Sequence, residues 1–350
     1  MAATMKAWRL SAYGEGGDPA KAIATLKLED VPAPTPGKGE VCVKVEYASV
    51  NPIDWKLFSG GFHAVCPCVF PYTPGFDIAG SVCAVGEDVT DFKVGDGVIA
   101  NTGLVETCCT PPPAAGNCGA FAEYAVVPAN FCSSRGAASA ESLAGLPLVG
   151  LTSYQALFTG NGRSFAGERL GDMKKGDKLL VLGGSSSAGL FAIQMCKEAG
   201  IHVAVTASSN KMPDGTPKME FVKTLGANEV IDYKNQDWSE VLAGKDFDQI
   251  YDCVGDDADL VKASKVLKKG GSFVSIANFN PASASTDEVR FANYLLKSNA
   301  EDLNALVKMT EKVSPIKVFV DSVVPFADVP AALTKSLGMQ SGGKILIKVA

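Results

Sequence analysis

The middle of the chain reads Lys178-Leu179-Leu180-Val181-Leu182, then Gly183-Gly184-Ser185-Ser186-Ser187-Ala188-Gly189, then a largely apolar segment over residues 190–199. The short apolar run before two glycines predicts a buried strand, and the longer segment after the turn predicts a helix. A glycine- and serine-rich turn between a strand and a helix suits a dinucleotide, because its amides and the helix N-terminus favour pyrophosphate. Residues 183–189 are therefore the candidate cofactor-binding turn.

The spacing in this turn is Gly183-x-x-Ser186-x-x-Gly189, so a serine stands at the middle glycine of the dinucleotide fingerprint. Gly183 would permit the tight turn, and Gly189 would allow the helix to pack closely on the strand. Ser186 adds bulk near the phosphate, but its hydroxyl can donate to a phosphate oxygen. A turn of this composition that binds no ligand is the alternative interpretation.

The pattern of apolar residues along the sequence changes near residue 141. Before it, residues 1–128 alternate short β-branched runs with Gly and Pro, which predicts an antiparallel barrel or sandwich. After it, strand and helix segments alternate, which predicts a doubly wound parallel sheet. The predicted helices cover residues 144–158 and 190–199, and the six predicted strands cover residues 178–182, 201–206, 229–232, 249–253, 272–277 and 289–296.

The tail is again rich in short β-type runs, at residues 317–324 and 343–349. We therefore expect the chain to return to its first domain, so that the doubly wound domain is an insertion. The predicted domains are residues 1–128 with 316–350, and residues 129–315.

The end of the second strand indicates which dinucleotide binds. NAD-binding folds usually carry an acidic residue about twenty positions after the glycines, where it receives the ribose 2'-hydroxyl. Here Ser208 stands nineteen residues after Gly189, followed by Ser209 and Lys211. Hydroxyls and a cation favour the extra phosphate of NADPH. Lys218 is a second candidate, and ordinary solvated lysines are the alternative for both.

Composition excludes several function classes. The 350 residues carry a net charge of -6 with no basic block, which argues against nucleic acid or anionic membrane as a partner. The sequence contains no run of eighteen apolar residues, so no membrane span is predicted. The first residues resemble no signal or transit segment. The ten cysteines are interpreted as reduced. We expect a cytoplasmic protein, with organelle association left open.

The residues as a whole resemble the quinone oxidoreductase branch of the medium-chain dehydrogenase/reductase superfamily, which includes zeta-crystallin and plant alkenal reductases. The resemblance covers nearly the whole chain. It rests on residues 48–56, 74–80, 94–98, 119–124, 150–157 and 225–233. It implies a GroES-like β-barrel substrate domain with an inserted six-stranded Rossmann domain, and it is compatible with a homodimer.

The resemblance also implies a site without metal. Zinc-dependent members carry a cysteine near Asn51 and Gly-His-Glu where this chain has Gly75-Phe76-Asp77. The nearest approach to a metal site is Cys66-Pro67-Cys68 or the group Cys108, Cys109 and Cys118, and loop thiols are the favoured interpretation of both.

Family position suggests catalytic roles for Asn51, Asp54, Lys56 and Thr152, and cofactor contacts for Tyr233, Val254, Asn278 and Phe279. A turn, a helix cap and a surface lysine are the alternatives for the first three. The last three follow strands at the carboxyl edge, where ligands lie in open α/β sheets.

The expected activity is NADPH-dependent reduction of a quinone, or of the C=C bond of an α,β-unsaturated carbonyl, by direct hydride transfer. Donors such as the Asn51 amide or the Lys56 ammonium could stabilise the product oxygen. Two alternatives stay open: an enoyl-thioester reductase, and a protein that binds NADPH without turnover.

Overall fold

The computed structural model describes residues 4–63, 67–103, 119–167, 170–278, 288–339 and 341–350. Internal contacts divide the chain into two compact units. Unit 1 contains residues 1–148, 298–308 and 318–350, and unit 2 contains residues 149–297 and 309–317. The predicted barrel domain ended at residue 128, whereas unit 1 continues to residue 148, because α3 (Ala140–Leu143) packs on strands β3, β4 and β5.

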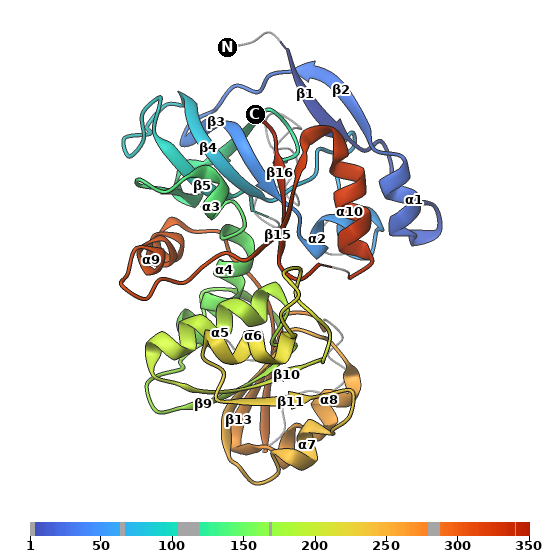
Figure 1. The fold of residues 1–350 in the computed structure, drawn as a ribbon. Coiled ribbons are helices and arrows are strands. Elements are labelled where there is room, and N and C mark those ends of the chain that lie inside the picture. Colours follow the sequence, from blue (N-terminus) through green and yellow to red (C-terminus); the bar gives the residue numbers. More distant parts are fainter. Residues whose placement is uncertain (1–3, 64–66, 104–118, 168–169, 279–287, 340) are drawn as a thin grey trace. The chain divides into compact units, whose positions relative to one another are not determined.

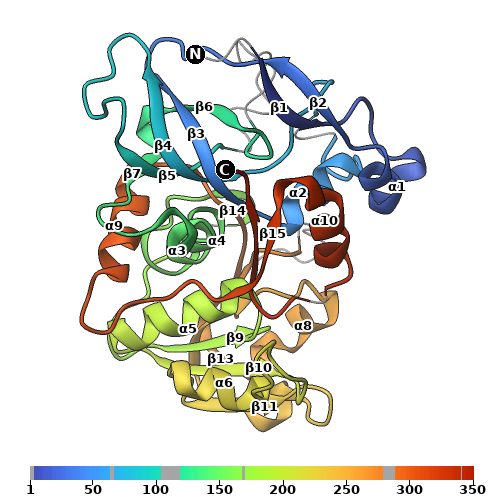
Figure 2. The same ribbon diagram turned by 45° about the horizontal axis from the view of Figure 1, so that its top comes forward.

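Unit 1 is built on sheets that are antiparallel except for the parallel pair formed by the two C-terminal strands, β15 and β16. A seven-stranded sheet has the order β15-β16-β3-β4-β5-β7, with β6 also paired to β3, and β1 and β2 form a separate pair (Figure 2). The strands are β1 (Thr4–Arg9), β2 (Lys27–Pro32), β3 (Glu40–Ser49), β4 (Asp77–Val85), β5 (Gly97–Asn101), β6 (Tyr124–Pro128), β7 (Cys132–Ser134), β15 (Val320–Pro325) and β16 (Lys344–Lys348). The predicted return of the tail is confirmed, because β16 pairs antiparallel with β3.

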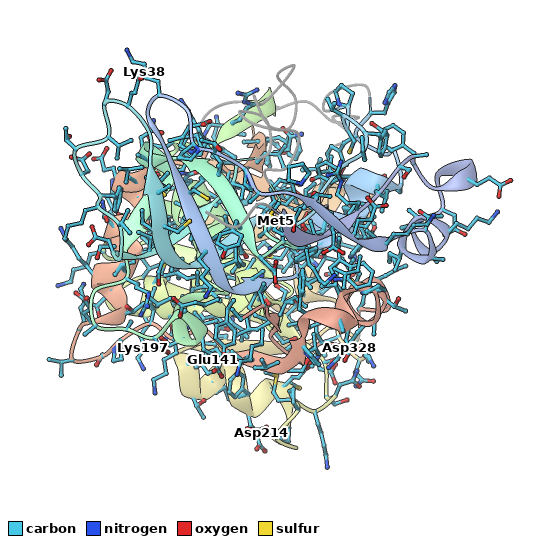
Figure 3. All side chains as sticks on the ribbon, turned by 90° about the horizontal axis from the view of Figure 1, so that it is seen from above. Met5, Lys38, Glu141, Lys197, Asp214 and Asp328 are labelled. Atoms are coloured by element: carbon cyan, nitrogen blue, oxygen red, sulfur yellow. The ribbon has the colours of Figure 1, made fainter. Side chains whose placement is uncertain are left out.

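The other elements of unit 1 are mostly short. Its helices are α1 (Pro19–Ala24), α2 (Pro52–Phe58), α3, α9 (Ala300–Thr310) and α10 (Val329–Leu337), and 3₁₀ turns lie at Glu15–Gly17, Ala129–Phe131 and Phe326–Asp328. The interior of the unit is apolar: Met5 is 1% exposed, while Lys38 projects outward from the turn before β3 (Figure 3).

Unit 2 contains the predicted parallel sheet. Its order is β11-β10-β9-β12-β13-β14-β8, and the first six of these strands are parallel. The strands are β8 (Arg163–Gly167), β9 (Lys178–Leu182), β10 (His202–Ala207), β11 (Glu229–Asp232), β12 (Phe247–Asp252), β13 (Leu267–Ser275) and β14 (Val289–Leu295). The helices are α4 (Pro147–Tyr154), α5 (Ser187–Ala199), α6 (Lys218–Leu225), α7 (Trp238–Val241) and α8 (Asp257–Lys262), with a 3₁₀ turn at Ala263–Lys265.

Helices cover both faces of this sheet. α5 and α6 lie together on one face, and α7 and α8 lie on the other (Figure 1). Strand order reverses between β9 and β12, so the carboxyl ends of these neighbours flank the switch point where open α/β sheets bind ligands.

Two predictions about unit 2 need correction. The sheet has seven strands rather than six, because β8 adds antiparallel to the edge strand β14. Its five residues, Arg163–Gly167, have no apolar run that would mark a strand. The helix predicted over residues 144–158 begins at Pro147 and changes into a π-helical turn, Gln155–Thr159. There the buried Gln155 amide exchanges hydrogen bonds with the backbone of Lys297.

The α7/α8 face of the sheet encloses an aromatic core. Phe247, Phe273 and Phe291 are each at most 1% exposed, and the rings of Phe273 and Phe291 stack with centroids 6.2 Å apart. Among the helices in the described part of the chain, none is both long and apolar enough to cross a membrane.

We expect Phe273→Ala to lower the free energy of unfolding by about 3–5 kcal/mol, because it removes a buried ring and leaves a cavity. Val261→Ala is the control, since Val261 is 80% exposed on α8. Denaturant unfolding of both variants measures the difference. Equal loss of stability in the two variants would show that the aromatic cluster does not carry the core.

Candidate functional sites

The turn after β9 has the geometry of a phosphate cradle. Gly183 adopts a φ of +83°, and a Cβ at Gly189 would overlap the carbonyl oxygen of Gly183. Ser186 is the N-cap of α5, and its Oγ accepts a hydrogen bond from the Gly189 amide at 3.1 Å. A hydroxyl that accepts in this way still has its own proton to donate. The structure therefore gives both glycines the roles expected of them, and it makes Ser186 a cap.

The turn is anchored on the neighbouring strand β10. The Gly183 amide donates to Thr206 Oγ1 at 2.9 Å, and the Gly184 amide donates to the Thr206 carbonyl at 2.9 Å. A Cβ at Gly184 would lie 2.6 Å from the Cβ of Val205. Bulk at this position is excluded by packing. The turn thus fits a dinucleotide pyrophosphate, with backbone amides and the N-terminus of the thirteen-residue helix α5 nearby.

The strand ends beside this turn carry the candidate residues for the adenosine end of the cofactor. β10 and β11 are parallel neighbours, with Ala207 opposite Asp232, so the segments that follow them share one edge of the sheet. Ser208 is buried at 4% exposure, while Ser209 and Lys211 are exposed. Tyr233 is 54% exposed. The structure brings these predicted residues to the same edge.

One carboxylate and one lysine at this edge of the sheet were not among the predicted cofactor-binding residues. Asp232 Oδ1 accepts from the Lys234 amide at 3.1 Å and Oδ2 accepts from Asn235 Nδ2 at 2.7 Å, so its carboxylate closes its own turn. Lys234 donates to Asn210 Oδ1 at 3.3 Å, which places its ammonium beside the segment that follows β10. Lys234 is therefore a further candidate for the phosphate end.

A buried carboxylate organises the two loops at the other side of the switch point. Asp252 Oδ1 accepts from the amides of Val254 and Gly255 at 2.8 and 3.0 Å, and Oδ2 accepts from Ser275 Oγ at 2.6 Å. Ser275 Oγ in turn accepts from the Asn278 amide at 2.9 Å. One carboxylate thus fixes the loops after β12 and β13 together. Burial raises its pKa, which these donors partly offset.

These two loops contain the remaining cofactor candidates. Val254 is 57% exposed and Asn278 is 9% exposed, with Asn278 Nδ2 donating to Asp257 Oδ1 at 2.6 Å. Gly255 has a φ of +88°, and a Cβ there would lie 3.0 Å from Ala277, so the loops are in close contact. Phe279 lies outside the described residues.

Unit 1 contains a buried polar cluster around Asn51 and Asp54. Asn51 is 2% exposed at the N-terminus of α2, and its Nδ2 donates to Asp77 Oδ2 at 2.8 Å. Asp77 also accepts from Ser49 Oγ at 2.6 Å and from the Leu148 amide at 2.7 Å. The Asn51 amide hydrogens are therefore engaged inside unit 1.

Asp54 is fully buried in the same cluster. Its Oδ2 accepts from the Asn51 backbone amide at 2.7 Å, whereas its Oδ1 is buried without a hydrogen-bond partner. Burial raises the pKa of Asp54 to about 8, and the Asp77 carboxylate adds to this rise. The Lys344 ammonium and the amides of Asn51 and Gly75 oppose it. The carboxyl is therefore mostly protonated at neutral pH.

The other two catalytic candidates lie in different settings. Lys56 is half-buried on α2, its ammonium lies 5.9 Å from the centre of the Trp55 ring, and burial lowers its pKa. Thr152 is 8% exposed on α4 and belongs to unit 2. Within unit 1, the structure therefore brings Asn51 and Asp54 into one cluster.

Sequence reasoning missed the residues that hold these sites together, namely Asp77, Lys234, Asp252, Ser275 and Lys344. A carboxylate one residue before the end of the predicted buried strand 249–253 is a weak signal for Asp252. A lysine that opens the apolar run Ile345-Leu346-Ile347 is a weaker one, because lysine at a strand end is normally exposed.

Comparisons with known proteins agree with this geometry. Family models match an alcohol dehydrogenase GroES-like domain over residues 37–135 and a zinc-binding dehydrogenase over residues 225–347. The chain is 32% identical over 356 residues to a chloroplast envelope quinone oxidoreductase homolog of Arabidopsis thaliana, covering 98% of both chains. It is 31% identical to an NADPH-dependent alkenal/one oxidoreductase of the same plant, covering 98% of this chain and 79% of that one.

A solved structure shows the same fold. The quinone oxidoreductase from Coxiella burnetii matches with a TM-score of 0.78 at 26% identity, covering 99% of this chain and all of that one. The chain belongs to the medium-chain dehydrogenase/reductase family, with a GroES-like unit and a Rossmann-like unit. Within that family it lies in the quinone oxidoreductase branch, and it is an oxidoreductase of the kind that uses a nicotinamide dinucleotide.

The second family model is named for zinc binding, but the described residues of this chain do not provide a set of zinc ligands. These residues include no group of three or more His, Cys, Asp or Glu side chains that could hold a metal ion. The Asn51 carboxamide oxygen already faces the Lys344 ammonium at 2.5 Å, and Phe76 offers no donor atom. The three cysteines of loop 101–119 and Cys66 lie outside the described residues.

We expect Asp252→Asn to raise the KM for the dinucleotide roughly tenfold, because the amide cannot accept from the Ser275 hydroxyl and from two backbone amides at once. Ser275→Ala should have a smaller effect, since the Val254 and Gly255 amides keep their acceptor. Asp248→Asn is the matched control at the other end of β12. Steady-state kinetics with cofactor titration measures all three. If Asp248→Asn raised the KM for the dinucleotide as much as Asp252→Asn, the role of Asp252 in fixing the cofactor loops would be contradicted.

The raised pKa of Asp54 predicts a pH dependence of stability. Folding favours the protonated form of Asp54, so its contribution to the free energy of unfolding is fully present below the pKa of the unfolded chain, about 4. This contribution is lost as the pH rises from there through the folded pKa of about 8. We expect the free energy of unfolding to fall by on the order of 1 kcal/mol per pH unit across this window.

Asp54→Asn should remove that slope, and Asp30→Asn, on an exposed side chain, should leave it unchanged. Denaturant unfolding at a series of pH values tests this. The same slope in the wild-type protein and in Asp54→Asn would refute it.

Proposed function

We propose that the protein catalyses NADPH-dependent reduction of quinones or of activated C=C bonds in α,β-unsaturated carbonyls, without a metal ion. The residues that follow β10 are the observation that favours NADPH over NADH. They include the buried Ser208 and the exposed Ser209 and Lys211, and they include no carboxylate. The nearby Asp232 carboxylate is engaged in its own turn. Lys211 and Lys234 supply the cations that an additional phosphate would need.

A bound NADPH would supply the hydride, and the chain would supply its orientation. The turn 183–189 holds the pyrophosphate by backbone amides and by the N-terminus of α5. The loops fixed by Asp252 and Ser275 position the nicotinamide half at the switch point of the sheet. Such positioning is a large part of hydride-transfer catalysis, because the donor and acceptor carbons must meet in one orientation.

The class of acceptor is supported by two relatives, which are named for quinone and for alkenal/one oxidation–reduction. Both kinds of acceptor take a hydride and a proton and develop negative charge on an oxygen atom. One site that orients a flat conjugated carbonyl beside the cofactor can therefore serve both. The metal-free form of the reaction is supported by two residues that are present: the Asn51 carboxamide oxygen faces the Lys344 ammonium, and the Phe76 side chain has no donor atom.

The test is oxidation of NADPH and of NADH with a benzoquinone, a short alkenal and an enoyl thioester, each with and without a chelator. We expect turnover with NADPH that survives chelation, and acceptance of the quinone or the alkenal. Turnover with the thioester alone would favour the thioester reductase. NADPH binding without turnover of any acceptor would refute the proposed activity.

Removing either phosphate-side cation should distinguish the two cofactors. We expect Lys211→Ala and Lys234→Ala each to raise the KM for NADPH by roughly tenfold and to leave the KM for NADH unchanged, since a charge-assisted hydrogen bond is worth about 1.5–3 kcal/mol. Lys223→Ala, on an exposed lysine of α6, is the control. Equal effects on both cofactors would contradict the phosphate assignment.

A further inference from the structure

A chain of buried hydroxyl groups connects α4, β12 and the turn 183–189 inside unit 2. Ser153 on α4 and Tyr251 on β12 are both fully buried, and their hydroxyl oxygens lie 3.0 Å apart. Ser153 Oγ also donates to the Ala188 carbonyl at 3.2 Å. Ala188 is the second residue of α5 and belongs to the turn. The chain of hydroxyls therefore ends on the backbone that forms the proposed pyrophosphate site.

The donor and the acceptor in each contact follow from the number of hydrogens available. A carbonyl oxygen can only accept, so the single hydroxyl hydrogen of Ser153 goes to Ala188. Ser153 Oγ must therefore accept from the Tyr251 hydroxyl. Burial raises the pKa of Tyr251 well above its ordinary value, so the phenol keeps the hydrogen that it donates.

The thiol of Cys253 extends this chain to the cap of α5. Burial raises the pKa of this thiol, and hydrogen bonds with the hydroxyls of Ser186 and Tyr251 oppose the rise. The hydrogen of Tyr251 is already used on Ser153, so the thiol hydrogen faces Tyr251 and the Ser186 hydroxyl donates to the sulfur. Ser186 Oγ then keeps its lone pairs for the Gly189 amide. The chain thus orients the cap residue and leaves the phosphates to backbone amides.

The turn is tied to both strands that neighbour β9. On one side, two glycine amides of the turn donate to Thr206 of β10. On the other side, Tyr251 of β12 holds Ala188 through Ser153. β9 lies between β10 and β12 in the sheet, so the two ties act on the turn from opposite sides. Groups that bind a ligand must be held within about 0.5 Å of the productive geometry, and the two ties supply that support.

Packing and hydrogen-bond satisfaction do not require the two hydroxyls. The Ala188 carbonyl lies in the first turn of α5, where carbonyls already accept from amides four residues further on. The segment after α4 is held to β12 by a separate contact, from Gln249 Nε2 to the Ala156 carbonyl at 3.2 Å. Alanine at position 153 and phenylalanine at position 251 would fill nearly the same space without burying polar atoms. The hydroxyls are thus explained by the position of the turn rather than by the fold.

We propose that Tyr251 and Ser153 are positioning residues for the cofactor: together they hold the N-terminus of α5 where its amides meet the pyrophosphate. This inference rests on the proposed function only for the choice of NADPH, and it gives a role to two fully buried residues of unit 2. Removal of either hydroxyl weakens binding of the pyrophosphate and leaves hydride transfer from the bound cofactor unchanged.

The first test compares Tyr251→Phe with the wild-type protein by titration of three ligands. NADPH and 2'-phospho-ADP-ribose both contain the pyrophosphate, and we expect the Kd of each to rise roughly fivefold through the loss of one hydrogen bond. Adenosine 2'-monophosphate has no pyrophosphate, so its Kd should not change. At saturating NADPH, kcat should stay within about twofold of wild type, because binding is lost equally from the ground state and the transition state.

Ser153→Ala removes the next hydroxyl of the chain, and it decides the question if Tyr251→Phe does not fold. It should show the same pattern over the three ligands. Because both substitutions break one chain, the double variant should bind NADPH about as weakly as either single variant. Additive losses in the double variant overturn the proposal.

The matched control is Tyr294→Phe. Tyr294 is a buried tyrosine of the same sheet, on β14, and its hydroxyl donates to the Leu170 carbonyl, which lies outside the turn. This variant should bind all three ligands as the wild-type protein does. If it weakens NADPH binding as much as Tyr251→Phe, the proposal is overturned.

Two other outcomes also overturn the proposal. One is a folded Tyr251→Phe or Ser153→Ala that binds NADPH as tightly as the wild-type protein. The other is a rise in the Kd for adenosine 2'-monophosphate as large as that for NADPH, since this indicates a general loosening of unit 2. The proposed function fails separately, if the wild-type protein binds NADPH but reduces no acceptor, and the binding measurements then still decide this inference.

Discussion

A carboxylate buried away from water must be surrounded by hydrogen-bond donors, and both units of this protein are organised by that requirement. In unit 1, Asp77 at the start of β4 gathers a serine hydroxyl, an asparagine amide and a backbone amide. In unit 2, Asp252 at the end of β12 gathers two backbone amides and a serine hydroxyl. Loops that would otherwise be free to move are thereby fixed to the ends of buried strands, and three of the candidate functional residues, Asn51, Val254 and Asn278, lie on the segments fixed in this way.

Much of the fold could be predicted from the sequence, because apolar periodicity is a local property. The strand at residues 178–182 and the turn that follows it were predicted at their observed positions. The return of the tail to the first unit followed from its β-type pattern, and β16 confirms it. β8 escaped prediction because an edge strand needs few apolar residues, and its pairing with β14 depends on tertiary context.

The candidate sites were less predictable, because their geometry depends on residues far apart in the chain. Resemblance pointed to Asn51 and Asp54, but their partner Lys344 is almost three hundred positions away. Sequence also suggested that the Asn51 amide could donate to a substrate, whereas the structure shows both of its polar ends engaged within unit 1. Whether a side chain is available or already committed is a property of its neighbours, and a single sequence does not contain that information.

The position of Lys344 in the chain also has a consequence for synthesis of the protein. β3 and β4 are made before residues 149–297, and β16 is made after them. The contiguous segment of unit 2 can therefore begin to fold while unit 1 still lacks a strand and its buried cation. During that interval Asp77 has no ammonium to face, and residues 47–49 of β3 lack their partner strand β16, although β6 already pairs with residues 40–44 of β3. Unit 1 is thus the part of the protein that matures last, although its first strands are the first to be made.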